Sequence, residues 1–217
     1  MTKHFLFDFD GTLVDSMGYW AKCMVGVLDN HGIPYPDDIV NIITPLGGAG
    51  TIAHFQKMGL DLPTEVIAAE IHEVLTPMYE NVIPEKSDVT RCLKRMREMG
   101  LGLHVLTASP HKWLDPALKR LGMWELFDNI WSSDDFGTGK TNPDIYRMAA
   151  EKIGVDVSDV TFLDDNINAD KAAKLSGVSV FGVYDDSSKG DTEEMKKITD
   201  FYVYDFSELL DYVEKNI

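Results

Sequence analysis

The stretch KHFLFDFDGTLVDS, from Lys3 to Ser16, decides how the rest of the chain is interpreted. Its apolar and aromatic residues predict a buried strand, yet that strand ends in Asp8 and Asp10. Carboxylates are costly at a buried strand end unless something there requires negative charge. Positions i and i+2 of a strand point to the same side, so both carboxylates can face one ligand. Gly11 permits a sharp exit from the strand, and backbone N–H groups beside it could hold an anion.

The composition is that of an ordinary globular protein with an acidic surface. Of 217 residues, 44% are hydrophobic and 26% are charged, and the formal net charge is -16. This balance argues against nucleic acid and acidic membranes as partners, because a polyanion would be repelled. No stretch approaches the roughly 18 uninterrupted apolar residues of a membrane span. We expect a monomer or a homodimer that does not bind a membrane.

The two cysteines, Cys23 and Cys92, fit neither a metal-binding spacing nor a disulfide framework. They are expected to be buried, reduced thiols, which is typical of a cytoplasmic protein.

Short apolar runs alternate with helical patterns along most of the chain. The predicted strands are 4–9, 101–108, 129–133, 160–165, 178–184 and 201–206, and the predicted helices are 88–99, 111–121, 143–153, 167–176 and 207–215. Strands that are apolar on both faces and joined by helices predict an α/β fold with a doubly wound parallel sheet, a Rossmann-like core. Between 16 and 83 only helical stretches occur, so we expect a catalytic core of 1–15 and 84–217 with an inserted α-helical cap at 16–83.

Polar residues follow the predicted strands where each strand ends. They are Asp8, Asp10, Thr107, Ser109, Asp164 and Asp165, with Lys140 in the loop after the third strand. In an open parallel sheet, ligands bind outside the carboxyl ends of the strands, so these residues are expected to converge. Two unit charges about 4 Å apart cost roughly 4 kcal/mol at an effective dielectric near 20, and a hard divalent cation removes that repulsion. Oxygen ligands suit Mg²⁺, while Thr107 and Lys140 supply a hydroxyl and a cation for a phosphoryl group.

Each of these residues also has a purely structural interpretation. Thr107 could be the N-cap of the helix that begins near SPHKW, and Asp164 with Asp165 could cap the helix that begins near Asn166. Lys140 on its own would be a solvated loop lysine. The coincidence of several such segments at one sheet edge favours a site.

Four ordered motifs, DFDGTLVDS, LTAS, GKTNPDIY and FLDDNINAD, resemble those of the haloacid dehalogenase-like superfamily, specifically its magnesium-dependent phosphatases. The resemblance implies that Asp8 is the nucleophile, which forms an aspartyl phosphate. It implies that Asp10 is the general acid for the leaving group and then the base for water. The metal ligands would be the Asp8 and Asp165 carboxylates and the Asp10 backbone carbonyl, with Asp164 binding directly or through water.

The same resemblance implies the residues that contact the phosphoryl group. Thr107, Ala108, Ser109 and Lys140 would contact the phosphoryl group. Trp20, which the family pattern does not specify, is expected to contact the substrate. The haloalkanoate dehalogenases of the superfamily lack the second aspartate of the first motif, so Asp10 favours phosphate chemistry.

Two departures from related sugar phosphomutases and phosphatases bear on the substrate. The mutases typically have a histidine five residues after the aspartate that corresponds to Asp15, where this chain has Trp20. Many relatives have an arginine in the cap loop that corresponds to TPLGGAGTIAHF, where this chain has none. A singly phosphorylated, partly apolar or neutral substrate is therefore expected over a bisphosphate or a carboxylate. Tyr19, Trp20 and the glycines of GGAG, interpreted as a flexible cap loop, could line its pocket, although both aromatics could equally belong to the cap's own core.

The sequence therefore predicts a magnesium-dependent phosphatase of a small phosphorylated metabolite. Within the superfamily, a phosphoglycolate phosphatase or a sugar phosphomutase are alternatives. A phosphoaspartate signalling module also places acids, a threonine and a lysine at a parallel sheet edge. Such receiver domains are shorter, have no helical cap, and carry their phosphoryl-accepting aspartate on a middle strand.

Overall fold

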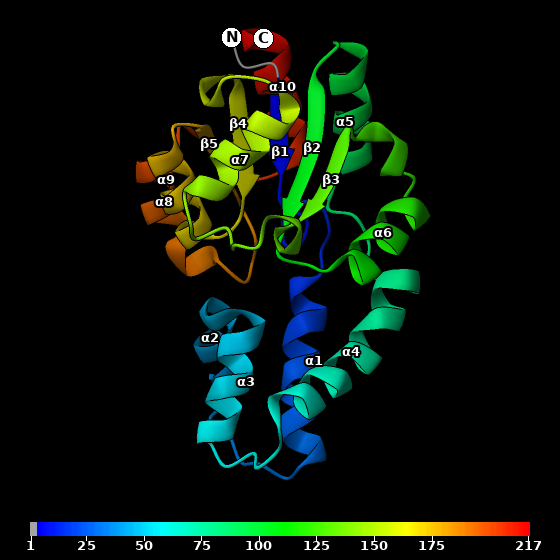
Figure 1. Cartoon of the computed structure of the whole chain (residues 1–217), viewed down its shortest axis with the longest axis vertical. Coiled ribbons are helices and arrows are strands. Elements are labelled where there is room, and N and C mark those ends of the chain that lie inside the picture. Colours follow the sequence, from blue (N-terminus) through cyan, green and yellow to red (C-terminus); the bar gives the residue numbers. More distant parts are fainter. Residues whose placement is uncertain (1–3) are drawn as a thin grey trace. The chain divides into compact units, whose positions relative to one another are not determined.

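The structure is a computed structural model that describes residues 4–217, apart from the side chain of Pro45. The chain forms two compact units (Figure 1). The sheet unit comprises Met1–Asp15 and Pro84–Ile217, and the helical unit comprises Ser16–Ile83. In the described part of the chain, every helix is too short or too polar to cross a membrane.

The sheet unit contains one sheet of six parallel strands, in the order β3-β2-β1-β4-β5-β6. The strands are β1 His4–Phe7, β2 Gly102–Thr107, β3 Asn129–Ser132, β4 Val160–Asp164, β5 Ser179–Val183 and β6 Phe201–Val203. The chain builds outward from β1 to β3 on one side, and then returns to build β4 to β6 on the other. The prediction of a doubly wound α/β fold is confirmed, with strand ends that differ by up to three residues.

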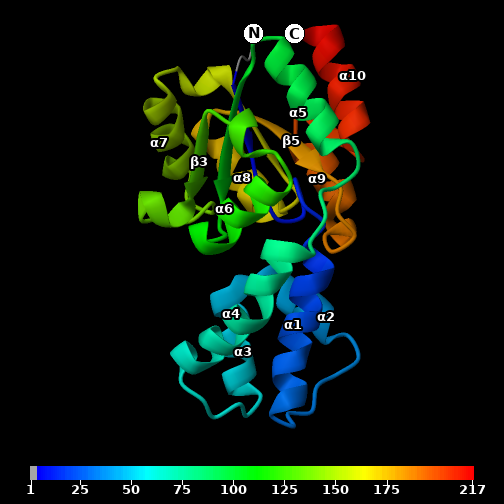
Figure 2. The same ribbon diagram turned by 90° about the vertical axis from the view of Figure 1, so that its right-hand side faces the viewer.

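Helices cover both faces of the sheet (Figure 2). They are α5 Val89–Glu98, α6 His111–Arg120, α7 Asp144–Ile153, α8 Ile167–Ser176, α9 Thr192–Ile198 and α10 Phe206–Asn216. Short 3₁₀ turns occur at Trp124–Leu126, Ser133–Phe136, Val157–Asp159 and Lys189–Asp191. In Figure 2, α7 lies on one side of the sheet and α5 and α10 lie on the other.

The central strand β1 shows why these strands are apolar throughout. Successive side chains of a strand point to opposite faces. Leu6 belongs to the buried cluster that includes residues of α7 and α8. Phe7 stacks with Phe206 of α10 at 6.3 Å between ring centres. Because helices cover both faces, neither side of β1 can be polar.

The neighbouring central strands β1 and β4 are where the direction of winding reverses. Phe7 of β1 is in register with Leu163 of β4, and the Asp8 N–H donates to the Leu163 carbonyl at 2.9 Å. Asp8 and Asp164 are therefore the next residues along two adjacent strands. This reversal is the position at which open α/β sheets bind ligands.

The helical unit contains α1 Met17–Asn30, α2 Ile39–Ile43, a 3₁₀ turn at Thr44–Leu46, α3 Gly47–Lys57 and α4 Thr64–Asn81. The interpretation of GGAG as a flexible loop is wrong, because these glycines form the first turn of α3. Gly47 has a φ of 65°, which lets the chain change direction between the 3₁₀ turn and the helix. Ile52 and Phe55 of α3 are buried, and this burial outweighs the roughly 1 kcal/mol that a helical glycine costs.

Candidate active site

Three carboxylates meet at the carboxyl ends of β1 and β4. Asp8, Asp164 and Asp165 are all at least 95% buried, since their exposed fractions are 5%, 0% and 5%. Each offers one oxygen, and these oxygens lie within 4.8 Å of one another. The two segments are 156 residues apart along the chain, so only the sheet topology brings them together.

Lys140 is the cation that reaches this cluster. Its Nζ lies 2.6 Å from Asp8 Oδ1 and donates to Asp164 Oδ2 at 2.7 Å. The Lys140 side chain is 11% exposed, and the Tyr146 hydroxyl of α7 donates to its backbone carbonyl at 2.7 Å. The loop before α7 therefore holds the lysine in place, and Lys140 is not a solvated loop residue.

The titration behaviour of the cluster follows from its burial and charge. Burial raises the pKa of Asp164 to about 7, and the attraction of Lys140 only partly opposes this. Burial, and then repulsion by Asp164 and Asp8, raises the pKa of Asp165 well above its usual value. Burial alone would lower the pKa of Lys140, but Asp164 and Asp8 raise it above its usual value. The raised pKa values mean that Asp164 and Asp165 lose their protons readily only when a positive charge beyond that of Lys140 is present.

These residues fit a divalent cation. When all are ionised, the three carboxylates and one ammonium leave two uncompensated negative charges. An all-oxygen donor set with this charge suits Mg²⁺. The Asp8, Asp164 and Asp165 carboxylates could hold it, with the Asp10 backbone carbonyl close by in the chain.

Asp10 is oriented by a residue from the loop after β2. The Ser109 hydroxyl donates to Asp10 Oδ2 in a short hydrogen bond. The Ser109 N–H donates to Thr107 Oγ1 at 3.1 Å, which uses a lone pair of that hydroxyl and leaves its hydrogen for another acceptor. Thr107 is 1% exposed and Ala108 is exposed. The predicted residues of the DFDGT and LTAS motifs therefore lie together.

The alternative interpretations of these residues as helix caps are not supported. The N-cap residue of α6 is Pro110, so Thr107 does not cap that helix. The N-cap of α8 is Asn166, whose side chain accepts from the N–H groups of residues 168 and 169. Asp164 Oδ1 accepts from the Asn166 N–H at 2.7 Å, which orients Asp164 at the strand end.

Three further polar residues beside the cluster were not predicted from the sequence. Asp170 of α8 is fully buried, and neither carboxylate oxygen has a hydrogen-bond partner among the described residues. Burial, then Asp164 and Asp165, raise the pKa of Asp170 well above its usual value. The available signal was its position as the last residue of the FLDDNINAD motif. The others are Lys86 and Asp185, which form an ion pair at 3.0 Å.

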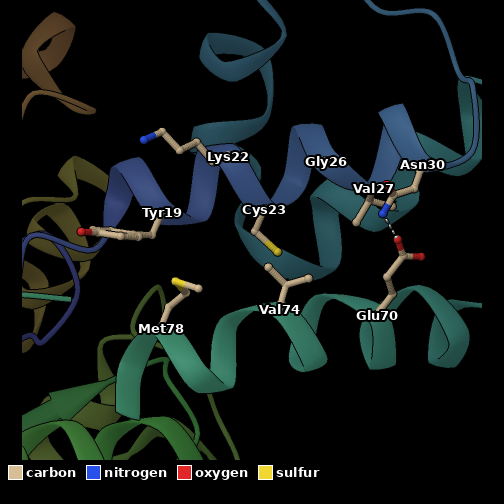
Figure 3. Close-up of a pocket in the computed structure, with 9 residues that line it drawn as sticks. All are labelled: Tyr19, Lys22, Cys23, Gly26, Val27, Asn30, Glu70, Val74 and Met78. Atoms are coloured by element: carbon tan, nitrogen blue, oxygen red, sulfur yellow. Dashed lines mark hydrogen bonds between the residues drawn. The ribbon is translucent and has the colours of Figure 1, made fainter. Parts of the chain in front are cut away.

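The predicted aromatic residues of the helical unit have different surroundings. The Trp20 indole N–H donates to the hydroxyl of buried Tyr79 at 2.7 Å, so this group serves packing within the unit. Tyr19 lines a groove of about 350 Å³ between α1 and α4 (Figure 3). Cys23 and Val74 face each other across this groove. Trp20 and the glycines at 47, 48 and 50 are not among its lining residues.

Comparisons with known proteins identify relatives over most of the chain. The sequence model of the family described as haloacid dehalogenase-like hydrolase matches residues 2–177. The validoxylamine A 7'-phosphate phosphatase of Streptomyces hygroscopicus is 28% identical over 187 residues, covering 84% of this chain and 86% of its own. The phosphorylated carbohydrates phosphatase of Thermotoga maritima is 24% identical over 180 residues, covering 82% and 83%.

A solved structure confirms the fold. CbbY from Rhodobacter sphaeroides, determined in complex with xylulose-(1,5)bisphosphate, superposes with a TM-score of 0.81 over 96% of both chains, at 24% identity. The acidic cluster lies where the direction of winding reverses, and the family model matches most of the chain. The chain therefore belongs to the haloacid dehalogenase-like hydrolases.

Proposed function

We propose that the protein is a magnesium-dependent phosphatase that hydrolyses a small phosphorylated metabolite through an aspartyl phosphate on Asp8. The observation that carries this proposal is the buried cluster of Asp8, Asp164 and Asp165, with Lys140 bound to two of its members. Such a cluster requires a cation, and its position at the reversal of winding is where substrates bind in this fold class.

In the first half of the reaction, a carboxylate oxygen of Asp8 attacks phosphorus, and the bond from phosphorus to the leaving oxygen breaks. Asp10 gives its proton to that oxygen as the alcohol leaves. The Ser109 hydroxyl fixes the direction of the Asp10 carboxyl. In the second half, Asp10 takes a proton from water as the water oxygen bonds to phosphorus, and the bond from Asp8 to phosphorus breaks.

The remaining residues hold charge in place. Lys140 orients Asp8, and the Thr107 hydroxyl donates to a phosphoryl oxygen. The ligands of the metal would be the Asp8 and Asp165 carboxylates and the Asp10 carbonyl, with Asp164 as a direct or water-mediated ligand. When bound, Mg²⁺ supplies the positive charge that offsets the phosphoryl oxygens.

The proposed substrate class is supported by the names of the relatives and by the absence of basic residues from one segment of the helical unit. Relatives named for validoxylamine A 7'-phosphate and for phosphorylated carbohydrates support a small phosphorylated metabolite. Residues 44–55 of the helical unit contain neither Arg nor Lys, which favours a substrate with a single phosphate. In this proposal the helical unit is the cap that excludes water during the reaction and opens for release.

The test is phosphate release from p-nitrophenyl phosphate by the full chain, with Mg²⁺ and with a chelator. We expect turnover that needs the metal and that falls by at least about 10³-fold in Asp8→Asn, because no other group replaces the nucleophile. Asp144→Asn is the control, since this exposed residue of α7 forms a surface ion pair with Arg147. Turnover that survives in Asp8→Asn, or a stable Asp8 phosphate without turnover, would overturn the proposal.

A further inference from the structure

Lys86 is a half-buried lysine that the mechanism above does not use. Its Nζ donates to the Gly11 carbonyl at 2.7 Å, to the Tyr184 carbonyl at 2.5 Å and to Asp185 Oδ2 at 3.0 Å. An ammonium has three hydrogens, so these acceptors satisfy it completely. The side chain is only 17% exposed, and it ties the loop after β1 to the end of β5.

The backbone around Lys86 is fixed to the same loop. The Lys86 N–H donates to the Leu13 carbonyl, and the Asp15 N–H donates to the Pro84 carbonyl, both at 3.0 Å. Val14 and Glu85 form an antiparallel bridge. The ammonium therefore starts from a rigid position, and its reach to Gly11 is set by the paired backbones rather than by a mobile loop.

Gly11 is the residue through which Lys86 can act on the site. It directly follows Asp10, and its α-carbon faces the Asp165 carboxylate so closely that a Cβ built there would lie 2.4 Å from Asp165 Oδ2. The next residue, Thr12, donates from its hydroxyl to Asp165 Oδ1 at 3.0 Å. A small displacement of the Gly11 peptide would therefore shift both Asp10 and Asp165.

The carboxylate that pairs with Lys86 is itself held in place by its neighbours. Asp185 is 5% exposed, and its other oxygen accepts from the N–H and hydroxyl of Ser187. A buried ion pair is a poor means of stabilising a fold, since an apolar pair of similar volume does as well or better. What an apolar side chain could not do is direct hydrogen bonds to the carbonyls of residues 11 and 184.

We infer that Lys86 is a positioning residue, which holds the Gly11 peptide so that Asp10 and Asp165 keep their places for proton transfer and metal binding. This inference rests on the proposed phosphatase function. The segment that begins at Pro84 thereby has a role in ordering the loop after β1, which follows the proposed nucleophile Asp8.

The experiment compares five forms of the full chain with p-nitrophenyl phosphate over a range of Mg²⁺ concentrations. They are the wild type, Lys86→Met, Asp185→Asn, the double variant Lys86→Met/Asp185→Asn, and Lys174→Met. Lys174 is the matched control, because it also pairs with an aspartate, Asp200, that accepts from a backbone N–H of β5. Thermal unfolding and calorimetric Mg²⁺ binding are measured for each form.

In Lys86→Met, we expect kcat to fall by about 10- to 100-fold and Mg²⁺ binding to weaken by about 10-fold, as for lost outer-shell partners of a metal site. KM for the aryl phosphate should change far less. Asp185→Asn leaves Lys86 on both carbonyls and should keep kcat within about threefold, a change too small to reflect lost outer-shell positioning. The double variant removes the unpaired buried charge, so it should regain thermal stability but not kcat.

Other results separate the inference from the function on which it rests. If the double variant or a folded Lys86→Met has wild-type kcat and Mg²⁺ affinity, Lys86 is only structural and the inference is overturned. The same holds if Asp185→Asn loses as much kcat as Lys86→Met. If the wild type releases no phosphate, the proposed function fails first, and weaker Mg²⁺ binding in the double variant still tests the positioning.

Discussion

At the scale of single residues, Gly11 is the position where the site leaves least room. Its φ is 77°, and a Cβ there would meet all three atoms of the Asp165 carboxyl group at 2.4 to 2.7 Å. We expect Gly11→Ala to lower the free energy of unfolding by about 1–3 kcal/mol, through backbone strain and the steric clash. It should also lower kcat by at least about 10-fold, since small misplacements of reacting groups are costly. Denaturant unfolding and aryl phosphate turnover check both, with Gly190→Ala as control, because a Cβ there meets nothing within 4 Å.

The convergence of the acidic residues could be predicted because each follows an apolar strand. Parallel strands end at one edge, so Asp8 and Asp164 had to be neighbours once the winding order was known. Lys86 and Asp185 could not be predicted in the same way. Each lies in a polar turn with no periodic pattern, and their pairing depends on how the loop after β1 packs against the end of β5. Asp170 is the last residue of the FLDDNINAD motif, but it lies in α8 rather than at a strand end, so the strand-end argument gave it no role.

At the scale of elements, His111 joins α6 to the 3₁₀ turn at Ser133–Phe136. Its Nδ1 lies 2.8 Å from Asp115 Oδ1 and its Nε2 lies 2.9 Å from Asp135 Oδ2. Both ring nitrogens are therefore engaged by carboxylates of the sheet unit. The hydrogen bond from the ring to Asp115 most strongly, and the one to Asp135 as well, raises the pKa of His111 above its ordinary value.

This link makes stability depend on pH in a defined direction. A raised pKa in the folded state means that the stabilisation is complete below the ordinary histidine pKa of about 6.5, and is lost as the pH rises through the folded-state value. The ring is 41% exposed, so the contribution should stay below about 1 kcal/mol. We expect wild type to unfold at most about 2–4 °C above His111→Gln near pH 5.5, with the gap closing by pH 9. A gap that widens with pH, or one unaffected by 1 M NaCl, would contradict the ion-pair explanation.

The elements missed or misread from the sequence share one cause. Helix α9 buries only Met195 within the polar stretch DTEEMKKITD, so no amphipathic period marked it. The start of α3 is rich in glycine, which is typical of loops, yet its later residues Ile52 and Phe55 are buried. In both cases, tertiary burial of one or two side chains decides the structure, and local pattern does not report it.

At the scale of the whole molecule, the two units have separate interiors. Leu28, Phe55, Ile67 and Leu75 are buried in the helical unit, while the strands and their flanking helices supply the interior of the sheet unit. The acidic cluster, Lys140, Ser109 and Lys86 all belong to the sheet unit. The groups proposed to perform the chemistry therefore do not depend on the helical unit for their positions.

The two chain segments that bound the helical unit are paired with each other inside the sheet unit, and this permits a decisive deletion. Asp15 donates to the Pro84 carbonyl at 3.0 Å, and Val14 and Glu85 form an antiparallel bridge. Antiparallel partners can be joined by a hairpin connection of about two to five residues.

We therefore expect a variant with 16–83 replaced by a short Gly–Ser turn to unfold cooperatively. It should bind Mg²⁺ within about threefold of the full chain, because the metal's expected protein ligands are all retained. Its turnover of aryl phosphate should fall by at least about 10-fold, since nothing excludes water from the reaction. Circular dichroism, calorimetry and phosphate release test each part. Undiminished turnover would remove the cap role, whereas a loss of Mg²⁺ binding in a folded variant would show that the sheet unit does not form the metal site alone.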